Sequence, residues 1–244
     1  MRFGIQLYTL RELEEPLSET IERVGETAFE GVEFAGLGDE PPKSVSSAID
    51  RSGLSVAGAH IGVESIADNY DETLETYTEI GCSNFVVPSY ERTAFESKAD
   101  AREAGRRLSS LADELAGDDV TLHYHNHSFE YAELDGEYAF DVFLEAAKGV
   151  QFEIDIGLTN RAGVDPLEVI ERYGDRISLV HVTDSISGVD GAQHVDLGDG
   201  EVDLETCVDL CEDVGVNWLL FEHGLTDDPI ASMEGAAETL ESIS

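Results

Sequence analysis

The sequence is poor in basic residues. Its 244 residues include 14 Lys and Arg against 53 Asp and Glu, which gives a formal net charge of −39. Binding to the phosphates of nucleic acid needs clustered Lys and Arg. The nearest approach to such a cluster is Arg102, Arg106 and Arg107, whose spacing places them on an exposed helix face beside acidic neighbours such as Glu103. We therefore expect no nucleic-acid partner.

The chain also lacks a long hydrophobic run and a cysteine framework. No stretch approaches the roughly 20 apolar residues that cross a bilayer, and MRFGIQLYTL at the start reads as a strand rather than a signal peptide. The cysteines are Cys82, Cys207 and Cys211, and the last two fit the core of an expected helix better than a metal site. We expect a cytoplasmic protein with reduced thiols and no membrane partner.

The chain has a large excess of acidic residues. Very acidic chains are often disordered, but 41% of these residues are hydrophobic, and apolar runs recur from end to end, as in a folded protein. A carboxylate-covered surface suits a high-salt cytosol, where counter-ions screen its self-repulsion. We interpret the chain as a halophilic acidic protein and expect its stability to rise with KCl.

Short apolar runs alternate with amphipathic stretches along the whole chain. The expected strands are 3–8, 31–34, 54–60, 84–88, 120–126, 151–156, 177–182 and 218–222. The expected helices are 17–28, 43–51, 70–80, 98–115, 139–147, 166–173, 204–214 and 229–243. Near-continuous apolar strands bounded by glycine turns are typical of a parallel sheet covered on both faces.

This alternation predicts an α/β protein with one domain over residues 1–244, a closed (β/α)₈ TIM barrel, since such barrels use about 200–250 residues. A doubly wound open sheet is the alternative. Against the open sheet, the first strand runs into Tyr8-Thr9-Leu10-Arg11, without the glycine-rich GxGxxG turn of dinucleotide-binding folds.

Histidines mark the ends of the expected strands. All 7 fall at or just beyond these ends, and none lies in an expected helix. His123, His125 and His127 share the segment TLHYHNHSFEY with Asn126 and Glu130. A barrel of this type keeps its active site on the face where its strands end, so the pattern predicts a site there.

Three consecutive expected strands end in potential metal ligands, namely Asp155, His181 and Glu222. Two carboxylates and an imidazole at one pole suit a divalent cation such as Mn²⁺, Mg²⁺, Co²⁺ or Zn²⁺. A fourth ligand would come from the fifth strand. The alternative, that each is a buried polar group satisfied by hydrogen bonds, accounts less well for three of them in register.

Nine short segments occur in a characteristic order: IQLYTLR, GVEF, AHIG, YHNHSFEY, FEIDIG, AGVDPLEVI, LVHVTD, GDGEVDL and LLFEHG. Together they resemble the xylose isomerase-like TIM barrels, over nearly the whole chain. This sugar phosphate isomerase/epimerase superfamily includes inosose dehydratase, hydroxypyruvate isomerase and endonuclease IV. The resemblance implies that Asp155, His181 and Glu222 hold the metal with a fifth-strand carboxylate. Here that strand reads LHYHNH, so the fourth ligand is Glu130 or a histidine, with His125 preferred.

The resemblance implies a metal-dependent isomerase or epimerase acting on a sugar or cyclitol. A carboxylate would remove a proton next to a metal-bound carbonyl, giving an enediolate that is then reprotonated. Glu222 would be the base as well as a ligand, and Glu130 the partner acid. Only Arg11, Arg92 and Arg161 come within reach of the pole, which favours a neutral substrate. The residues expected to bind substrate are Gln6, His60, Asn126, His127, Arg161 and His223.

Other functions stay open at this point. A dehydratase or lyase acting on a keto-sugar or inosose would use the same metal and base. Many relatives with this type of fifth strand have Lys in an HxKD motif where this chain has Thr183, and Gln or Glu where it has His223. A nuclease like endonuclease IV would need more histidines, yet Leu158 stands where that enzyme has one. A non-catalytic sugar-binding barrel is a further alternative, and many relatives form homo-oligomers.

Overall fold

Eight parallel strands close into a barrel in the computed structural model, which describes residues 1–187 and 194–243. Around the barrel the strand order is β1-β10-β9-β8-β5-β4-β3-β2. The strands are β1 Arg2–Gln6, β2 Gly31–Phe34, β3 Ser55–His60, β4 Asn84–Val87, β5 Thr121–His125, β8 Gln151–Asp155, β9 Ile177–Val182 and β10 Trp218–Phe221. Because the first strand pairs with the last, the predicted barrel is confirmed and the open sheet is excluded.

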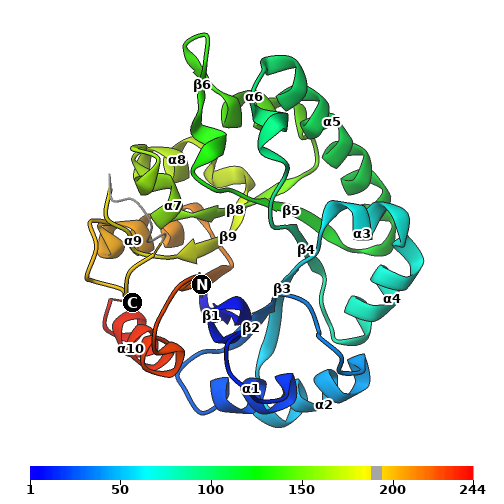
Figure 1. Cartoon of the computed structure of the whole chain (residues 1–244), viewed down its shortest axis with the longest axis vertical. Helices are drawn as coiled ribbons and strands as arrows, with labels where there is room; N and C mark the ends of the chain where they lie inside the picture. Colours follow the sequence, from blue (N-terminus) through cyan, green and yellow to red (C-terminus); the bar gives the residue numbers. More distant parts are fainter. Residues whose placement is uncertain (188–193, 244) are drawn as a thin grey trace.

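Helices surround this barrel on its outside (Figure 1). They are α1 Leu17–Val24, α2 Pro42–Ser52, α3 Val63–Asp68, α4 Tyr70–Glu79, α5 Lys98–Leu115, α6 Ala139–Ala146, α7 Ile156–Arg161, α8 Pro166–Tyr173, α9 Leu204–Val214 and α10 Pro229–Ser242. Short 3₁₀ helices complete the connections: η1 Leu7–Leu10, η2 Arg92–Phe95, η3 Ala116–Asp118, η4 Phe129–Tyr131 and η5 Gly174–Arg176.

Helix α5 shows how the sequence produces this layer. The Ser97 side chain accepts a hydrogen bond from the backbone N–H of Asp100 and so caps the first turn. The buried residues of α5 recur at helical spacing and face the barrel. These residues are Ala101, Ala104, Gly105, Leu108, Leu111, Ala112 and Leu115. The expected helix at 98–115 is therefore confirmed.

Some elements differ from the expectation. A hairpin of β6 Glu133–Leu134 and β7 Glu137–Tyr138 turns at Asp135 and Gly136, whose φ values of 51° and 80° are those of an Asp-Gly hairpin turn. Helices α3 and α7 were not expected from the sequence either. Helix α7 begins directly after β8, where the Asp155 side chain caps it by accepting from the Leu158 N–H.

The interior of the barrel is apolar toward the strand starts and polar toward the strand ends. The apolar part consists of Ala57, Val86, Leu179, Trp218 and Leu220. Leu179 and Leu220 each lie two residues before a polar inward-facing side chain, His181 and Glu222, because side chains alternate along a strand. The carboxyl-terminal end of the barrel therefore offers a polar site.

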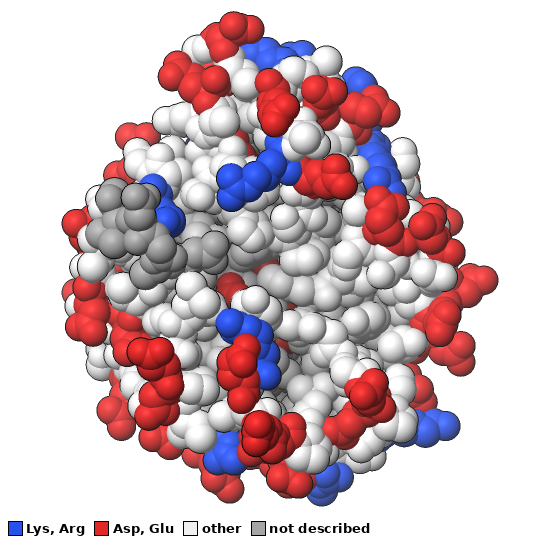
Figure 2. Space-filling view, viewed as in Figure 1, with Lys and Arg blue, Asp and Glu red and all other residues white. Residues whose placement is uncertain are grey.

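Acidic side chains are spread around the rim of the face shown in Figure 2, whereas its centre is largely free of charged groups. Within residues 1–187 and 194–243, no helix has both the length and the apolar character needed to cross a membrane.

Candidate metal centre

Four polar side chains converge at the carboxyl ends of neighbouring strands. His125 ends β5, Asp155 ends β8, His181 lies in β9, and Glu222 directly follows β10. The parallel register sets Asp155 beside His181, and His181 beside Leu220 on the next strand. One potential ligand atom from each of the four lies within 4.8 Å of the others, and all four side chains are buried. The barrel thus brings together the predicted residues Asp155, His181 and Glu222 with His125.

The donor set fits a divalent cation. One oxygen of Asp155, Oδ1, accepts hydrogen bonds from the Thr183 hydroxyl at 2.6 Å and the Leu158 N–H at 2.7 Å. The other, Oδ2, accepts none from the described residues, although His194 Nε2 lies 3.3 Å from it. A buried carboxylate oxygen without a hydrogen bond calls for an explanation. A cation bound by this oxygen would explain it, and the group of two carboxylates and two imidazoles suits Mn²⁺, Mg²⁺, Co²⁺ or Zn²⁺.

Glu222 is held by its neighbour on β9. Its Oε2 lies 3.0 Å from Nδ1 of His181. Burial alone would raise the pKa of the Glu222 carboxyl, but the hydrogen bond and charge of His181 outweigh burial and hold that pKa well below its usual range. Glu222 is therefore an ionised carboxylate, available as a ligand or as a proton acceptor.

A second layer of polar groups lies deeper in the barrel. Glu33 Oε2 is 2.7 Å from His181 Nε2 and accepts a 2.8 Å hydrogen bond from the Gln6 amide. Burial, followed by the charge of Glu153, raises the pKa of Glu33 to about 7. Burial would also raise the pKa of Glu153, but the nearby His181 and His125 outweigh it, so the Glu153 pKa lies well below its usual range. Gln6, which the sequence predicts to bind substrate, contacts Glu33 in this layer.

Glu130 lies on the other side of β5. Its Oε1 accepts a 2.7 Å hydrogen bond from the Tyr124 hydroxyl, and its Oε2 accepts from the His127 N–H at 2.9 Å. The Tyr124 ring packs on Phe143 of the outer helix α6, at 4.7 Å between ring centres. Because side chains alternate along a strand, this face of β5 is opposite to that of His125. Glu130 thus stands outside the group that His125 joins, and burial raises its pKa to about 7.

A cavity of about 470 Å³ opens above the four side chains. It is lined by Tyr8, Ala35, His60, Pro88, Ser89, His125, His127, Leu158, His194, Glu222 and Gly224. Of the residues expected to bind substrate, His60 and His127 line it. The others lie elsewhere: Gln6, Asn126, Arg161 and His223 are not among its lining residues.

Asn126 and His223 have identifiable structural partners. Asn126 Oδ1 accepts the backbone N–H of Asp155 at 3.0 Å, so this amide holds the main chain of a candidate ligand. His223 Nδ1 accepts the Leu225 N–H at 3.3 Å, and its Nε2 lies 3.8 Å from Asp196. Arg161 ends α7.

His194 is the cavity residue that the sequence did not single out. Its Nδ1 accepts the Gly224 N–H at 3.1 Å, so the ring proton must reside on Nε2, the atom that lies 3.3 Å from Asp155 Oδ2. The clustering of all histidines near strand ends was the only signal in the sequence. His123, by contrast, bonds to Ser178 Oγ at 2.7 Å within the barrel, and burial lowers its pKa to about 4.

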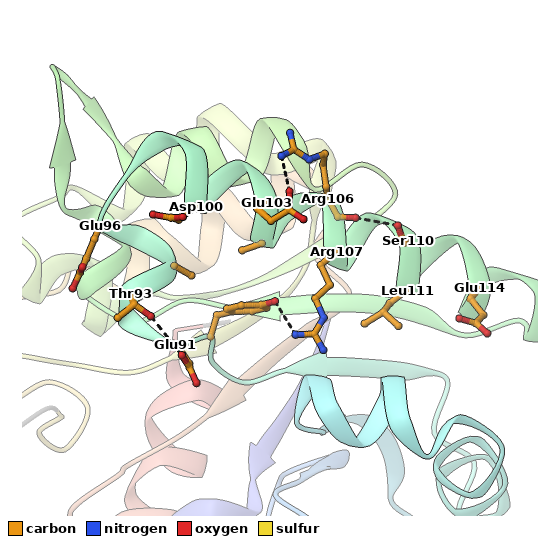
Figure 3. A pocket seen from close by; sticks show the side chains of 13 residues that line it. Glu91, Thr93, Glu96, Asp100, Glu103, Arg106, Arg107, Ser110, Leu111 and Glu114 are labelled. Carbon is orange, nitrogen blue, oxygen red and sulfur yellow. Dashed lines mark hydrogen bonds and ion pairs between the residues drawn. The ribbon is translucent and has the colours of Figure 1, made fainter.

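A second, larger cavity of about 800 Å³ lies outside the barrel along α5 (Figure 3). Its two cations are already engaged: Arg106 pairs with Glu103 at 2.7 Å, and Arg107 with Glu64 at 2.6 Å and with the Tyr90 hydroxyl. No histidine is among its lining residues. This cavity therefore lacks the histidines that line the cavity at the barrel mouth.

Comparison with known proteins agrees with this architecture. A model of the xylose isomerase-like TIM barrel family matches residues 21–243. The chain belongs to this family. An inosose dehydratase of Geobacillus kaustophilus (strain HTA426) is 26% identical to this chain over 188 residues. The match covers 68% of this chain but only 61% of the length of that relative.

Solved structures of other proteins share the fold. A sugar phosphate isomerase/epimerase from Parabacteroides distasonis ATCC 8503 superposes with a TM-score of 0.86 at 20% identity, covering 99% of this chain and 94% of that one. A probable 3-DHS dehydratase from Bacillus anthracis superposes with a TM-score of 0.79 at 11% identity, covering 99% of both chains. Structures named as an isomerase/epimerase and as a dehydratase thus both share this fold.

Proposed function

We propose that this protein is a metal-dependent isomerase or epimerase acting on a neutral sugar or cyclitol. One observation carries the proposal. His125, Asp155, His181 and Glu222 converge beneath a cavity of about 470 Å³. Among the described residues that line this cavity, Glu222 is the only carboxylate. The site thus combines a place for a cation with one group able to accept a proton.

When held by these four side chains, a divalent ion supplies Lewis-acid polarisation of a substrate carbonyl. The Glu222 carboxylate accepts the proton from the carbon beside that carbonyl and returns it to the former carbonyl carbon, while the proton of the adjacent hydroxyl moves to the former carbonyl oxygen. One base that serves both steps is enough to isomerise a ketose and an aldose. Inversion at a single carbon requires a second donor on the opposite face, and the remaining titratable lining side chains are histidines, apart from Tyr8.

The lining also supports a neutral, hydroxyl-rich substrate. His60, His127 and His194 offer ring nitrogens to substrate oxygens, and the N–H of His194 is fixed on Nε2 by the Gly224 contact. Neither Lys nor Arg is among the described lining residues, so a phosphate would gain no ion pair there.

Arg11 lies near the mouth of the barrel, but its guanidinium is already engaged by backbone carbonyls and by the Tyr8 ring. It donates to the carbonyls of Tyr8 and Gly224 at 2.7 and 2.6 Å and lies over the Tyr8 ring. We propose that Arg11 shapes the rim and that Glu130 supports the backbone of His127 without reaching the substrate. A cytoplasm of high ionic strength would suit the charge of −39.

A dehydratase acting on a keto-sugar or inosose is the second candidate, and the similarity to inosose dehydratase favours it. Its first step is the same removal of a proton beside a carbonyl. The electron pair then expels a β-hydroxyl, which leaves as water after taking up a proton. Thr183 cannot supply that proton, because its hydroxyl already donates to Asp155. A cavity histidine would have to act instead.

Metal content tests the common part of both functions. We expect the purified protein to carry about one divalent ion per chain and the Asp155→Asn variant to lose most of it. Thermal unfolding of both proteins checks that the variant is folded. Full occupancy in a folded Asp155→Asn protein would remove the metal centre from the proposal, and an ion-free wild-type protein would leave a non-catalytic sugar binder.

Isotope exchange separates the two reactions. Keto-hexoses, keto-pentoses and inososes are incubated with the protein in D₂O and followed by NMR and mass spectrometry. An isomerase or epimerase incorporates deuterium at the carbon beside the carbonyl and keeps all substrate oxygens. A dehydratase yields a product lighter by one water. Equal rates with phosphorylated and unphosphorylated sugars would contradict the preference for a neutral substrate.

A further inference from the structure

Three imidazoles converge on one buried oxygen beneath the candidate metal centre. Glu153 Oε2 lies 2.8 Å from His60 Nε2, 3.2 Å from His125 Nδ1 and 3.2 Å from His181 Nε2. The Glu153 side chain is fully buried. It precedes Asp155 by two residues on β8, which places it on the same inward face and about 6–7 Å deeper. The proposed proton transfer gives this carboxylate no role.

We call His125, Asp155, His181 and Glu222 the upper layer, and the deeper group of His60, His125, Glu153 and His181 the lower layer. His125 and His181 belong to both layers, and each ring has one nitrogen toward the upper layer and the other toward the lower layer. His181 has Nε2 toward Glu33 and Glu153, while its Nδ1 is 3.0 Å from Glu222. His125 has Nδ1 toward Glu153, which leaves Nε2 for the upper group that it forms with Asp155, His181 and Glu222. A neutral imidazole has one N–H and one lone pair. Whichever nitrogen binds a cation, the other must carry the proton.

The lower layer could itself be considered as a cation site, because His60, His125, Glu153 and His181 also bring ligand atoms within 4.8 Å of one another. Filling both layers at once would require His125 and His181 to use lone pairs on both nitrogens, which a neutral ring does not have. The upper layer is the one that meets the cavity, through His125 and Glu222. An ion in the upper layer therefore leaves one proton on His125 Nδ1 and one on His181 Nε2, and both nitrogens lie 3.2 Å from Glu153 Oε2.

We propose that Glu153 is a positioning residue that fixes the tautomers of both histidine ligands. Its carboxylate charge, 3.2 Å from both atoms, stabilises a proton on His125 Nδ1 and on His181 Nε2, so that His125 Nε2 and His181 Nδ1 present their lone pairs to a divalent ion. The inference rests on the proposed function, because it concerns the ion held by the upper layer. Carboxylates that accept the second N–H of a histidine ligand typically contribute about 10–100-fold to metal affinity.

Glu33 takes a smaller part in the same arrangement. Its Oε2 is 2.7 Å from His181 Nε2 and 3.4 Å from His60 Nε2, and no contact between Glu33 and His125 is recorded. Gly58 leaves the space for this carboxylate, since a Cβ at that position would lie 2.8 Å from Glu33 Oε1. Loss of the Glu33 charge should therefore disturb one histidine ligand, whereas loss of the Glu153 charge should disturb two.

Zinc binding by the full chain tests the proposal. Affinity and stoichiometry are measured by competition with a chromophoric chelator for the wild-type protein, Glu153→Gln and Glu33→Gln. The control is His123→Asn, which changes a buried histidine of β5 that bonds to Ser178 instead. We expect one Zn²⁺ per chain in every case, a Kd raised about 10–100-fold in Glu153→Gln, a smaller rise in Glu33→Gln, and little change in the control. Thermal unfolding verifies that each protein is folded.

A spectroscopic measurement distinguishes positioning from general destabilisation. Long-range ¹H–¹⁵N correlation spectra of the zinc-loaded protein, labelled with ¹⁵N in histidine, report which ring nitrogen carries the proton. We expect protons on Nδ1 of His125 and Nε2 of His181 in the wild type. In Glu153→Gln, at least one of these two signals should be lost or move to the other tautomer.

The outcomes separate this inference from the proposed function. An unchanged Kd in folded Glu153→Gln, or the opposite tautomers in the wild type, overturns the role of Glu153 and leaves the metal centre standing. Two Zn²⁺ per chain in the wild type and one in Glu153→Gln would make the lower layer a cation site of its own, which also overturns it. Absence of Zn²⁺ binding by the wild type would overturn both proposals.

Discussion

The Thr183 hydroxyl donates a 2.6 Å hydrogen bond to Oδ1 of Asp155, across the ends of two neighbouring strands. The same hydroxyl accepts the N–H of Gly157 at 2.8 Å. This approach requires glycine, since a Cβ at position 157 would lie 2.6 Å from the hydroxyl oxygen. Thr183 stands where the resemblance described above leads us to expect the Lys of an HxKD motif. Here the residue orients a candidate ligand.

Replacement of Thr183 by Val should therefore weaken metal binding. The methyl group fills the space of the hydroxyl but leaves Asp155 Oδ1 with one hydrogen bond fewer. We expect the Kd for Zn²⁺ to rise about 10-fold or more, with a loss of about 1–3 kcal/mol in the free energy of unfolding because the Gly157 N–H is left unpaired. Calorimetric titration measures the first and urea denaturation the second. Thr183→Ser should keep wild-type affinity; equal affinity in Thr183→Val would contradict the assigned role.

Glu222→Gln should abolish most of the activity. The amide cannot accept the substrate proton and is a weaker ligand than the carboxylate, and loss of a general base typically costs about 10²–10⁴-fold in rate. Deuterium incorporation into substrate measures the proton transfer directly. Glu64→Gln is the matched control, because Glu64 is exposed and pairs with Arg107 on the outer surface. Exchange at the wild-type rate in Glu222→Gln would assign the proton transfer to another group.

Glu130 should make stability depend on pH. Burial raises the pKa of its carboxyl from 4.5 to about 7. Because the folded state binds this proton more tightly than the unfolded chain, the contribution is fully present below about pH 4.5 and is lost as the pH rises through 7. The total is at most about 3.4 kcal/mol, at 1.36 kcal/mol per pKa unit.

Glu130→Gln removes this titration while keeping the shape of the side chain. Urea denaturation of both proteins at pH 5 and pH 8, at constant KCl, gives the comparison. From pH 5 to pH 8, we expect the free energy of unfolding of the variant to rise relative to that of the wild type by about 1–3 kcal/mol. A stability difference that does not change with pH would mean that Glu130 is ionised in the folded protein at both.

Salt should stabilise the fold. Asp and Glu outnumber Lys and Arg by 53 to 14, so the carboxylates on the surface repel one another, and molar salt shortens the range of that repulsion to about 3 Å. We expect the melting temperature to rise steeply between dilute buffer and molar KCl. Matched ionic strengths of KCl and NaCl test whether screening is sufficient. A melting temperature that does not change would rule out the halophilic interpretation.

Much of the architecture could be predicted because its determinants are local. Apolar runs such as those of β5 and β9 alternate with amphipathic helices such as α5, and repetition of that unit leads to a closed barrel. The hairpin of β6 and β7 was missed although Asp135-Gly136 is a strong turn signal. Helix α7 was not predicted because it starts at Ile156, the residue directly after the end of β8, without an intervening loop.

Some residues of the candidate site could likewise be predicted from the sequence, and others could not. Asp155, His181 and Glu222 follow from the sequence alone, because each stands where the inward-facing, apolar pattern of a strand stops. The roles of Gln6, Asn126 and Glu130 do not follow from it. Gln6 bonds to Glu33, which is far from it in the sequence but lies on the neighbouring strand. Glu130 bonds to Tyr124, on the face of β5 opposite to that of His125.

By itself, then, the sequence determined the barrel, the pole of the site and three of its four candidate ligands, since periodicity and strand ends are properties of the chain. Only the tertiary structure decided that His125 joins them and Glu130 does not. It also revealed His194 in the cavity and Glu153 beneath the histidines. The physical reason is that these relationships depend on which faces meet when eight strands close, and closure brings together atoms that sequence spacing does not relate.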